Sequence, residues 1–188
     1  MKVLGVDPGT LATGWGIVEA LPGGRLVAHA HGVVRTKPAD ALWDRLALIH
    51  GAILAVALEH RPNALSLEQC FVSKNVSSAL KLGHTRGVVM VAAKAAGADV
   101  FEYAPSQVKS AVTGSGKAEK HQVAEMVRIL LGLEANAPAD ASDAMAAAIC
   151  HINGRAQRVM ELAVVGNAGR APRLVATQLV PAKIGARR

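Results

Sequence analysis

The first twenty residues, MKVLGVDPGTLATGWGIVEA (residues 1–20), set the pattern for the whole chain. The apolar run KVLGVD predicts a buried strand that ends on a carboxylate, Asp7, and Pro8 and Gly9 force a turn directly after it. A charge at the end of a buried strand is costly unless something pairs with it. The rest of the sequence must therefore supply a partner for Asp7.

Two further strand patterns follow this turn. TGWGIVEA (13–20) and RLVAHAHGVVRT (25–36) flank the turn sequence PGG, and this arrangement predicts an antiparallel hairpin joined to the first strand. Gly14 and Gly16 lie inside the second strand, where glycine indicates a bulge or the close approach of another backbone.

Beyond residue 38 the apolar spacing alternates between helical and strand-like stretches. It predicts short strands over 64–69 and 99–103, and helices over 39–60, 77–97, 106–112, 118–133 and from 138 onward. The resulting order is three strands, a helix, a strand, a helix, a strand and three helices. This order predicts an α/β fold, with a mixed five-stranded sheet, an antiparallel edge hairpin and helices on both faces.

The length and composition favour one globular domain with a basic tail. The 188 residues are 51% hydrophobic, which is enough to build a single core. No acid follows Glu161, whereas several lysines and arginines do. We therefore expect one domain over residues 1–165 and a basic, mobile tail over 166–188.

The charge and the absence of targeting signals restrict the partners. A formal net charge of +7 favours nucleic acid first and an anionic membrane surface second, although a basic protein need not have a polyanionic ligand. The low aromatic content of 3% argues against a large base-stacking platform. We see no signal-peptide layout and no apolar run of membrane-spanning length, and we expect a cytoplasmic protein.

Four acidic residues stand out by their positions. Asp7 and Glu68 each close an apolar strand, and functional crevices in open α/β sheets lie at the carboxyl ends of strands. Asp140 and Asp143 are three residues apart near the start of a helix and share one of its faces. If that face packs against the same end of the sheet, the four carboxylates converge.

Converging carboxylates repel one another and take up protons unless a cation neutralises them. A donor set of oxygens, without histidine or thiol, selects Mg²⁺ or Mn²⁺, and two such ions suit the in-line cleavage of a phosphodiester. Taken singly, each acid also fits an ordinary role as a turn residue, a solvated strand end, a helix cap or a surface charge. The joint placement favours the metal-dependent interpretation.

The sequence resembles the bacterial RuvC family of Holliday junction resolvases over roughly residues 1–160. The matching motifs occur in order and at appropriate spacing: GVDPGTLATGWG (5–16), LEQCFVSKNVSSALKLGHTRG (67–87), FEYAPSQVKSAV (101–112), KAEKHQV (117–123) and PADASDAMAAAI (138–149). The resemblance implies a ribonuclease H-like fold and an endonuclease that resolves four-way DNA junctions by paired symmetric nicks in recombination and repair. It also implies two Mg²⁺ ions per subunit, with Mn²⁺ as a possible substitute.

The resemblance assigns roles to individual residues. It implies that the catalytic and metal-binding acids are Asp7, Glu68, Asp140 and Asp143. Some relatives carry histidine at the third of these positions, so the aspartate here implies an all-oxygen site. The implied DNA contacts are Lys109, Lys120 and the base-stacking Phe71, with Lys74, Lys81, Arg86 and Lys117 as weaker candidates. Without the resemblance, the cations also fit a solvated surface, and Phe71 also fits the core.

The implied assembly is a homodimer that packs through the helix starting near Ser77. Gly83 and Gly87 agree with this, because glycines four residues apart in a helix are explained by close packing of another backbone. A two-fold dimer suits a substrate with two-fold symmetry. We also expect a branch-migration helicase complex as a partner and association with the nucleoid during repair.

Three other functions compete with junction resolution. The first is a ribonuclease H-like nuclease that acts on RNA or on other branched substrates. The second is a non-catalytic DNA-structure binder, for which four acids near phosphate are electrostatically unfavourable. The third is an actin-like or sugar-kinase-like ATPase, which the DPGT motif also resembles, but the chain is too short for the second lobe of such a protein.

Overall fold

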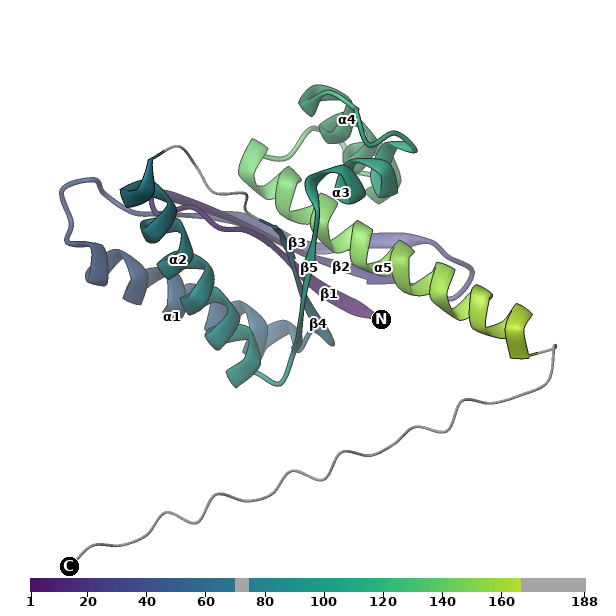
Figure 1. Ribbon diagram of the computed structural model, residues 1–188, viewed down its shortest axis with the longest axis horizontal. Coiled ribbons are helices and arrows are strands. Elements are labelled where there is room, and N and C mark those ends of the chain that lie inside the picture. Colours follow the sequence, from purple (N-terminus) through teal and green to yellow (C-terminus); the bar gives the residue numbers. More distant parts are fainter. Residues whose placement is uncertain (70–74, 167–188) are drawn as a thin grey trace, which may run out of the picture.

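A mixed five-stranded sheet, in the order β3-β2-β1-β4-β5, forms the middle layer of the computed structural model (Figure 1), which describes residues 1–69 and 75–166. The strands are β1 (Lys2–Asp7), β2 (Ala12–Ala20), β3 (Leu26–Arg35), β4 (Ala64–Glu68) and β5 (Asp99–Tyr103). The helices are α1 (Leu42–His60), α2 (Val76–Ala95), α3 (Pro105–Thr113), α4 (Lys120–Leu131) and α5 (Ala139–Gly166). The predicted order of strands and helices is confirmed.

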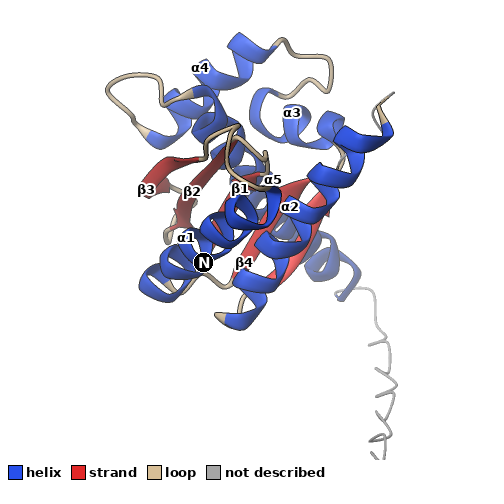
Figure 2. Cartoon of the chain, turned by 90° about the vertical axis from the view of Figure 1, so that its left-hand side faces the viewer, coloured by secondary structure: helices blue, strands red, loops and turns tan. Residues whose placement is uncertain are grey.

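The register of the strands brings two acids to one edge of the sheet. β1 runs antiparallel to β2 and parallel to β4, and β4 runs parallel to β5. The carboxyl ends of β1, β4 and β5 therefore share an edge, and Asp7 and Glu68 close the first two of these strands. α3 and α4 pack with α5 on one face of the sheet, whereas α1 and α2 cover the other face (Figure 2).

The face under α1 and α2 is an ordinary aliphatic core. Its fully buried side chains come from β1, β2, β4 and the two helices, and include Leu4, Val6, Ile17, Ile49, Ile53, Leu65, Leu67 and Val89. Burial of these side chains provides the usual hydrophobic stabilisation of a helix layer on a sheet.

The opposite face is built differently, because glycines let α5 lie almost against the strands. A Cβ atom at Gly5 would lie 1.8 Å from the carbonyl oxygen of Ala144, and one at Gly14 would lie 1.9 Å from that of Asp140. At Gly16 the same atom would lie 2.4 Å from Cγ of Met145. The predicted close approach of another backbone is confirmed at Gly14, whereas at Gly16 the neighbour is the side chain of Met145.

Polar contacts fix the position of α5 on this face. The buried Ser66 hydroxyl of β4 donates a 2.6 Å hydrogen bond to the carbonyl oxygen of Ala147. Farther along α5, the Asn153 amide donates to the carbonyl oxygen of Ala111 in α3. Ser66 therefore fixes α5 to the sheet at Ala147, and Asn153 fixes α5 to α3 farther along the helix.

Element boundaries differ slightly from the predictions. The first helix begins at Leu42 rather than residue 39, because Asp40 closes a turn with Lys37 through both its side chain and its amide. The predicted tail lies outside the described residues apart from Gly166, which ends α5. Within residues 1–69 and 75–166, no helix has the combination of length and hydrophobicity that crossing a membrane requires.

Candidate active site

A cavity of about 390 Å³ lies at the carboxyl ends of β1 and β4, between α3, α4 and the start of α5. Its lining combines three carboxylates and two lysines with three apolar side chains: Asp7, Glu68, Asp143, Lys109, Lys120, Val108, Val123 and Ala146. Five of the residues predicted for the site therefore meet around one hollow.

Local structure explains why Asp7 faces this cavity. Gly5 and Asp7 are two residues apart in β1, so both face α5. The turn after Asp7 is held by the buried Thr13, whose hydroxyl donates a 2.6 Å hydrogen bond to the carbonyl oxygen of Gly9. The strand end is thereby fixed under the first turns of α5.

The second pair of acids comes from α5. Gly14 is the register partner of Asp7, and its lack of a side chain leaves room for the backbone at Asp140. One turn later, Asp143 lines the cavity. Asp140 does not line it, although its charge acts on Asp7.

The carboxylates raise one another's proton affinity. Burial is the main cause that raises the pKa of Asp7 to about 6, followed by the charges of Asp143, Asp140 and Glu68. Burial, and then Asp143, also raises the pKa of Glu68. The site therefore holds more negative charge than its protein surroundings balance.

Lys120 provides part of the missing positive charge. Its ammonium lies 2.7 Å from Oδ2 of Asp143, and this hydrogen bond raises the pKa of Lys120. The lysine side chain is 70% exposed. A pair so open to solvent is weak, so the lysine is free to exchange Asp143 for another anion.

The donor chemistry fits a hard divalent cation. The acids offer carboxylate oxygens, which Mg²⁺ and Mn²⁺ prefer. Among the described residues no three acidic, histidine or cysteine side chains are already grouped closely enough to hold a metal ion.

The remaining predicted contacts fall in different places. Lys81 is exposed on α2, and Lys117 lines a neighbouring hollow of about 510 Å³ beside Thr113 and His121. Arg86 is buried and points into the protein, where it pairs with Glu102. The predicted contacts Phe71 and Lys74 lie outside the described residues.

Sequence reasoning missed two contributors to the site. One is Gly5, whose signal was its position two residues before Asp7 on the same face of a strand. The other is the inward contact of Arg86, which also donates a 2.5 Å hydrogen bond to the backbone carbonyl oxygen of Glu68. No local pattern marks that contact, because the two residues belong to different elements.

Comparison with known proteins finds close relatives over most of the chain. The family described as "Crossover junction endodeoxyribonuclease RuvC" matches residues 3–151. The relative in Trichlorobacter lovleyi is 50% identical over 171 residues, which cover 91% of this chain and 96% of that protein. The relative in Myxococcus xanthus is 47% identical over 185 residues, covering 97% and 96% respectively. Both carry the same family description.

Solved structures agree with these sequence matches. The RuvC protein of Thermus thermophilus, in complex with a Holliday junction substrate, has a TM-score of 0.80 and 36% identity, covering 84% of this chain and 96% of its own. A yeast mitochondrial Holliday junction resolvase, only 12% identical, shares the fold with a TM-score of 0.67. The predicted ribonuclease H-like fold is confirmed.

Proposed function

Because the chain belongs to the RuvC family of crossover junction endodeoxyribonucleases, we propose that it resolves four-way DNA junctions by paired symmetric nicks in opposing strands. The nicks serve homologous recombination and DNA repair. The observation that carries this proposal is the cavity at the strand ends, which unites carboxylates for a metal with lysines for phosphate.

The acids are proposed to hold the metal. Asp7, Glu68 and Asp143 line the cavity, and Asp140 adds charge from the preceding turn of α5. When bound, Mg²⁺, at two ions per subunit and with Mn²⁺ as a substitute, supplies the Lewis acidity for in-line displacement of the 3′-oxygen. The raised pKa of Asp7 supports this role, because a bound cation offsets both the burial of the carboxylate and the neighbouring negative charges that raise this pKa.

The lysines are proposed to bring the phosphate to these acids. Lys109 and Lys120 line the same cavity as the carboxylates, so a DNA backbone that enters it meets positive charge beside the negative cluster. The apolar lining residues Val108, Val123 and Ala146 limit the space left for water. Further DNA contacts proposed from the sequence are Phe71, Lys74, Lys81 and Lys117.

A homodimer through α2 is proposed as the working assembly. Small and apolar residues recur every three or four positions on the exposed side of this helix, namely Val76, Leu80, Gly83, Gly87 and Val91. The three larger ones are 68%, 59% and 61% exposed. Within one chain, a Cβ at either glycine would meet nothing within 4 Å, which leaves space for a second helix.

Sedimentation would test this dimer. A charge at an apolar interface is strongly unfavourable, so we expect Leu80→Glu to yield monomers. Leu48→Glu, at an exposed leucine on α1, is the control and should leave the assembly unchanged. A Leu80→Glu protein that sediments like the wild type would contradict the dimer through α2.

The remaining proposals concern the domain boundaries, a partner complex and the location in the cell. We propose a nuclease domain over residues 1–165 with a basic tail that follows it, a branch-migration helicase complex as a partner, and a cytoplasmic location at the nucleoid. These rest on the resemblance and on the charge of the tail.

A synthetic four-way junction with Mg²⁺ tests the function. We expect paired symmetric nicks from the wild type, and binding without nicking from Asp7→Asn. If the wild type cuts RNA–DNA hybrids or other branched substrates in preference to the junction, the alternative nuclease is favoured. If it cuts no branched substrate with Mg²⁺ or Mn²⁺, the proposed function is wrong and a structure-specific DNA binder remains.

A further inference from the structure

Arg86 is a buried cation that lies on the other side of the sheet from the acids. Glu102 and Leu67 are register partners in parallel strands, so their side chains share a face, and Leu67 belongs to the core under α1 and α2. Arg86 in α2 meets Glu102 on that face. The Arg86 side chain is only 11% exposed there.

Its guanidinium joins α2 to the ends of two strands. One terminal nitrogen, Nη1, donates a 2.5 Å hydrogen bond to the backbone carbonyl oxygen of Glu68, the last residue of β4. The other, Nη2, forms an ion pair with Oε1 of Glu102 in β5. Charge-assisted bonds from a rigid guanidinium fix both the distance and the direction between the groups that they join.

The backbone carbonyl of Glu68 therefore accepts a hydrogen bond from Arg86 on one face of the sheet, while the Glu68 side chain lines the cavity on the other face. Glu68 pairs with Tyr103, and its carboxylate lines the cavity that also contains Asp7. The next residue, Gln69, donates its amide to the carbonyl oxygen of Tyr103 at 2.8 Å. Together with Arg86, this bond sets the backbone from which the Glu68 carboxylate projects.

We propose that Arg86 is a positioning residue for the metal-binding carboxylate of Glu68, and that it does not contact DNA. The proposal rests on the proposed function and departs from the sequence-based interpretation of Arg86 as a phosphate contact. Loss of the guanidinium would release the end of β4, and a carboxylate on a looser backbone binds a cation less tightly.

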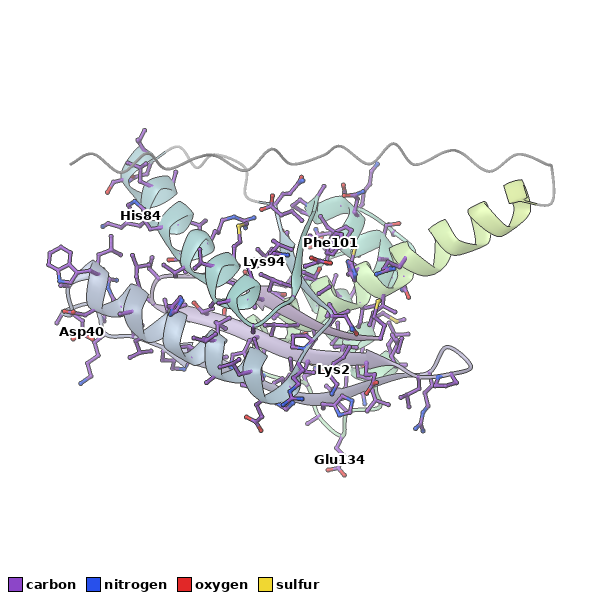
Figure 3. The ribbon with its side chains drawn as sticks, turned by 90° about the horizontal axis from the view of Figure 1, so that it is seen from below. Lys2, Asp40, His84, Lys94, Phe101 and Glu134 are labelled. Carbon is purple, nitrogen blue, oxygen red and sulfur yellow. The ribbon has the colours of Figure 1, made fainter. Side chains whose placement is uncertain are left out.

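The chain offers a matched control at the other end of the same two elements. Lys94 in α2 pairs with Asp99 in β5 at 2.8 Å, and the two side chains are 64% and 70% exposed. Figure 3 shows Lys94 toward the C-terminal end of α2, with His84 toward the opposite end. Lys94→Ala therefore removes an ion pair between the same helix and strand without touching Glu68.

The experiment compares three full-length variants with the wild type: Arg86→Lys, Glu102→Gln and Lys94→Ala. Three quantities are measured: Mg²⁺ binding by calorimetry without DNA, the salt dependence of junction binding in chelator, and nicking as a function of Mg²⁺ concentration. Arg86→Lys keeps the charge but loses the two-pronged geometry, so we expect its Mg²⁺ dissociation constant and its half-saturating Mg²⁺ concentration to rise about tenfold.

The control variants distinguish a positioning role of Arg86 from a purely structural role and from a phosphate contact. We expect Glu102→Gln to shift Mg²⁺ binding in the same direction by a smaller factor, and Lys94→Ala to leave it unchanged. The salt slope of junction binding should be that of the wild type in all three. Folding is checked by thermal melting, and Glu102→Gln provides the comparison if Arg86→Lys is poorly folded.

Two results would overturn the proposal. A lower melting temperature of Arg86→Lys with unchanged Mg²⁺ binding would make Arg86 a purely structural residue. In a fourth variant, Arg86→Gln, which removes the charge, a salt slope reduced by about one would instead make Arg86 a phosphate contact. If the wild type fails to nick junctions, the proposed function fails, but calorimetry still decides whether Arg86 controls the Glu68 site.

Discussion

The two faces of the sheet carry helices in different ways. On one face, α1 and α2 rest on large aliphatic side chains such as Leu4 and Ile53, which keep the helices at an ordinary distance. On the other, Gly5 and Gly14 leave nothing between the strands and α5, whose carbonyl oxygens lie where a Cβ would be. The first arrangement provides stability. The second brings the acids of a helix to the acid of a strand.

Gly14→Ala should break the second arrangement and give the largest effect. Its Cβ would lie 1.9 Å from the carbonyl oxygen of Asp140, so the first turn of α5 must move away from Asp7. A displacement of about 1 Å costs on the order of 100-fold in rate, and overpacking costs about 1–3 kcal/mol of stability. Single-turnover nicking and urea denaturation measure the two losses.

Gly51→Ala on α1 is the control for this change. A Cβ there would meet nothing within 4 Å, so the substitution should stabilise the helix by about 1 kcal/mol and leave nicking unchanged. Wild-type activity and stability in the Gly14→Ala protein would contradict the close approach of α5.

Ile53→Ala should weaken the first face without affecting the site. The side chain is fully buried under α1, and its truncation should cost about 2–5 kcal/mol in free energy of unfolding. Because Ile53 does not line the cavity that holds the acids, the Mg²⁺ concentration that half-saturates nicking should stay within about twofold of the wild type. A large shift would show that the two faces are coupled.

Asp7→Asn should abolish nicking and, in chelator at high pH, increase the free energy of unfolding. Burial, followed by the charges of Asp143, Asp140 and Glu68, raises the pKa of Asp7 from 3.8 to about 6, whereas the charge of Lys120 acts in the opposite direction. The folded protein therefore binds this proton more tightly than the unfolded chain does. In chelator, the free energy of unfolding of the wild type should fall as the pH rises from about 4 to about 6, and stay lower above.

The asparagine variant lacks this titration. At pH 8 in chelator it should exceed the wild type by roughly 2–3 kcal/mol, at about 1.4 kcal/mol for each pKa unit. Saturating Mg²⁺ should remove the difference by stabilising only the wild type. The comparison uses urea denaturation at a series of pH values. A pH-independent difference between the two proteins would refute the assigned shift of Asp7.

Lys120→Ala should give the smallest of these effects. The quantity that changes is the salt dependence of junction binding. Among the described residues the exposed ammonium pairs with Asp143, and transferring it from this pair to a phosphate costs little. We expect the salt slope of junction binding to fall by about one, measured by fluorescence anisotropy in chelator. Lys94→Ala should leave the slope unchanged. Equal slopes for Lys120→Ala and the wild type would place Lys120 outside the DNA interface.

Local patterns were sufficient to predict the order of strands and helices. Each change of apolar period marks one element, and Asp7 and Glu68 were recognisable because both end apolar strands. The features that could not be predicted are contacts between residues that are far apart in the sequence but close in space. The contact of Arg86 with Glu102 joins a helix to a strand, and no spacing in the sequence reports it.

The approach of α5 was only partly predictable. Glycines inside a strand indicate that something comes close, but they do not say what does. Likewise, Asp140 and Asp143 share a helix face, yet of the two only Asp143 lines the cavity, and the spacing in the sequence does not distinguish them. Lys117 lines the neighbouring hollow instead, since the loop before α4 turns it toward His121.

The dependence of the site on α5 determines when, during synthesis of the chain, all four acids are present. The ribosome makes Asp7 well before Asp143, because Asp7 ends β1 whereas Asp143 belongs to α5. A nascent chain can form the hairpin and even the core under α1 and α2 while it still lacks half of its acids. Under the proposed assignment of the four acids, nuclease chemistry begins only after α5 has been made, and a fragment that ends before α5 carries no complete set of acids.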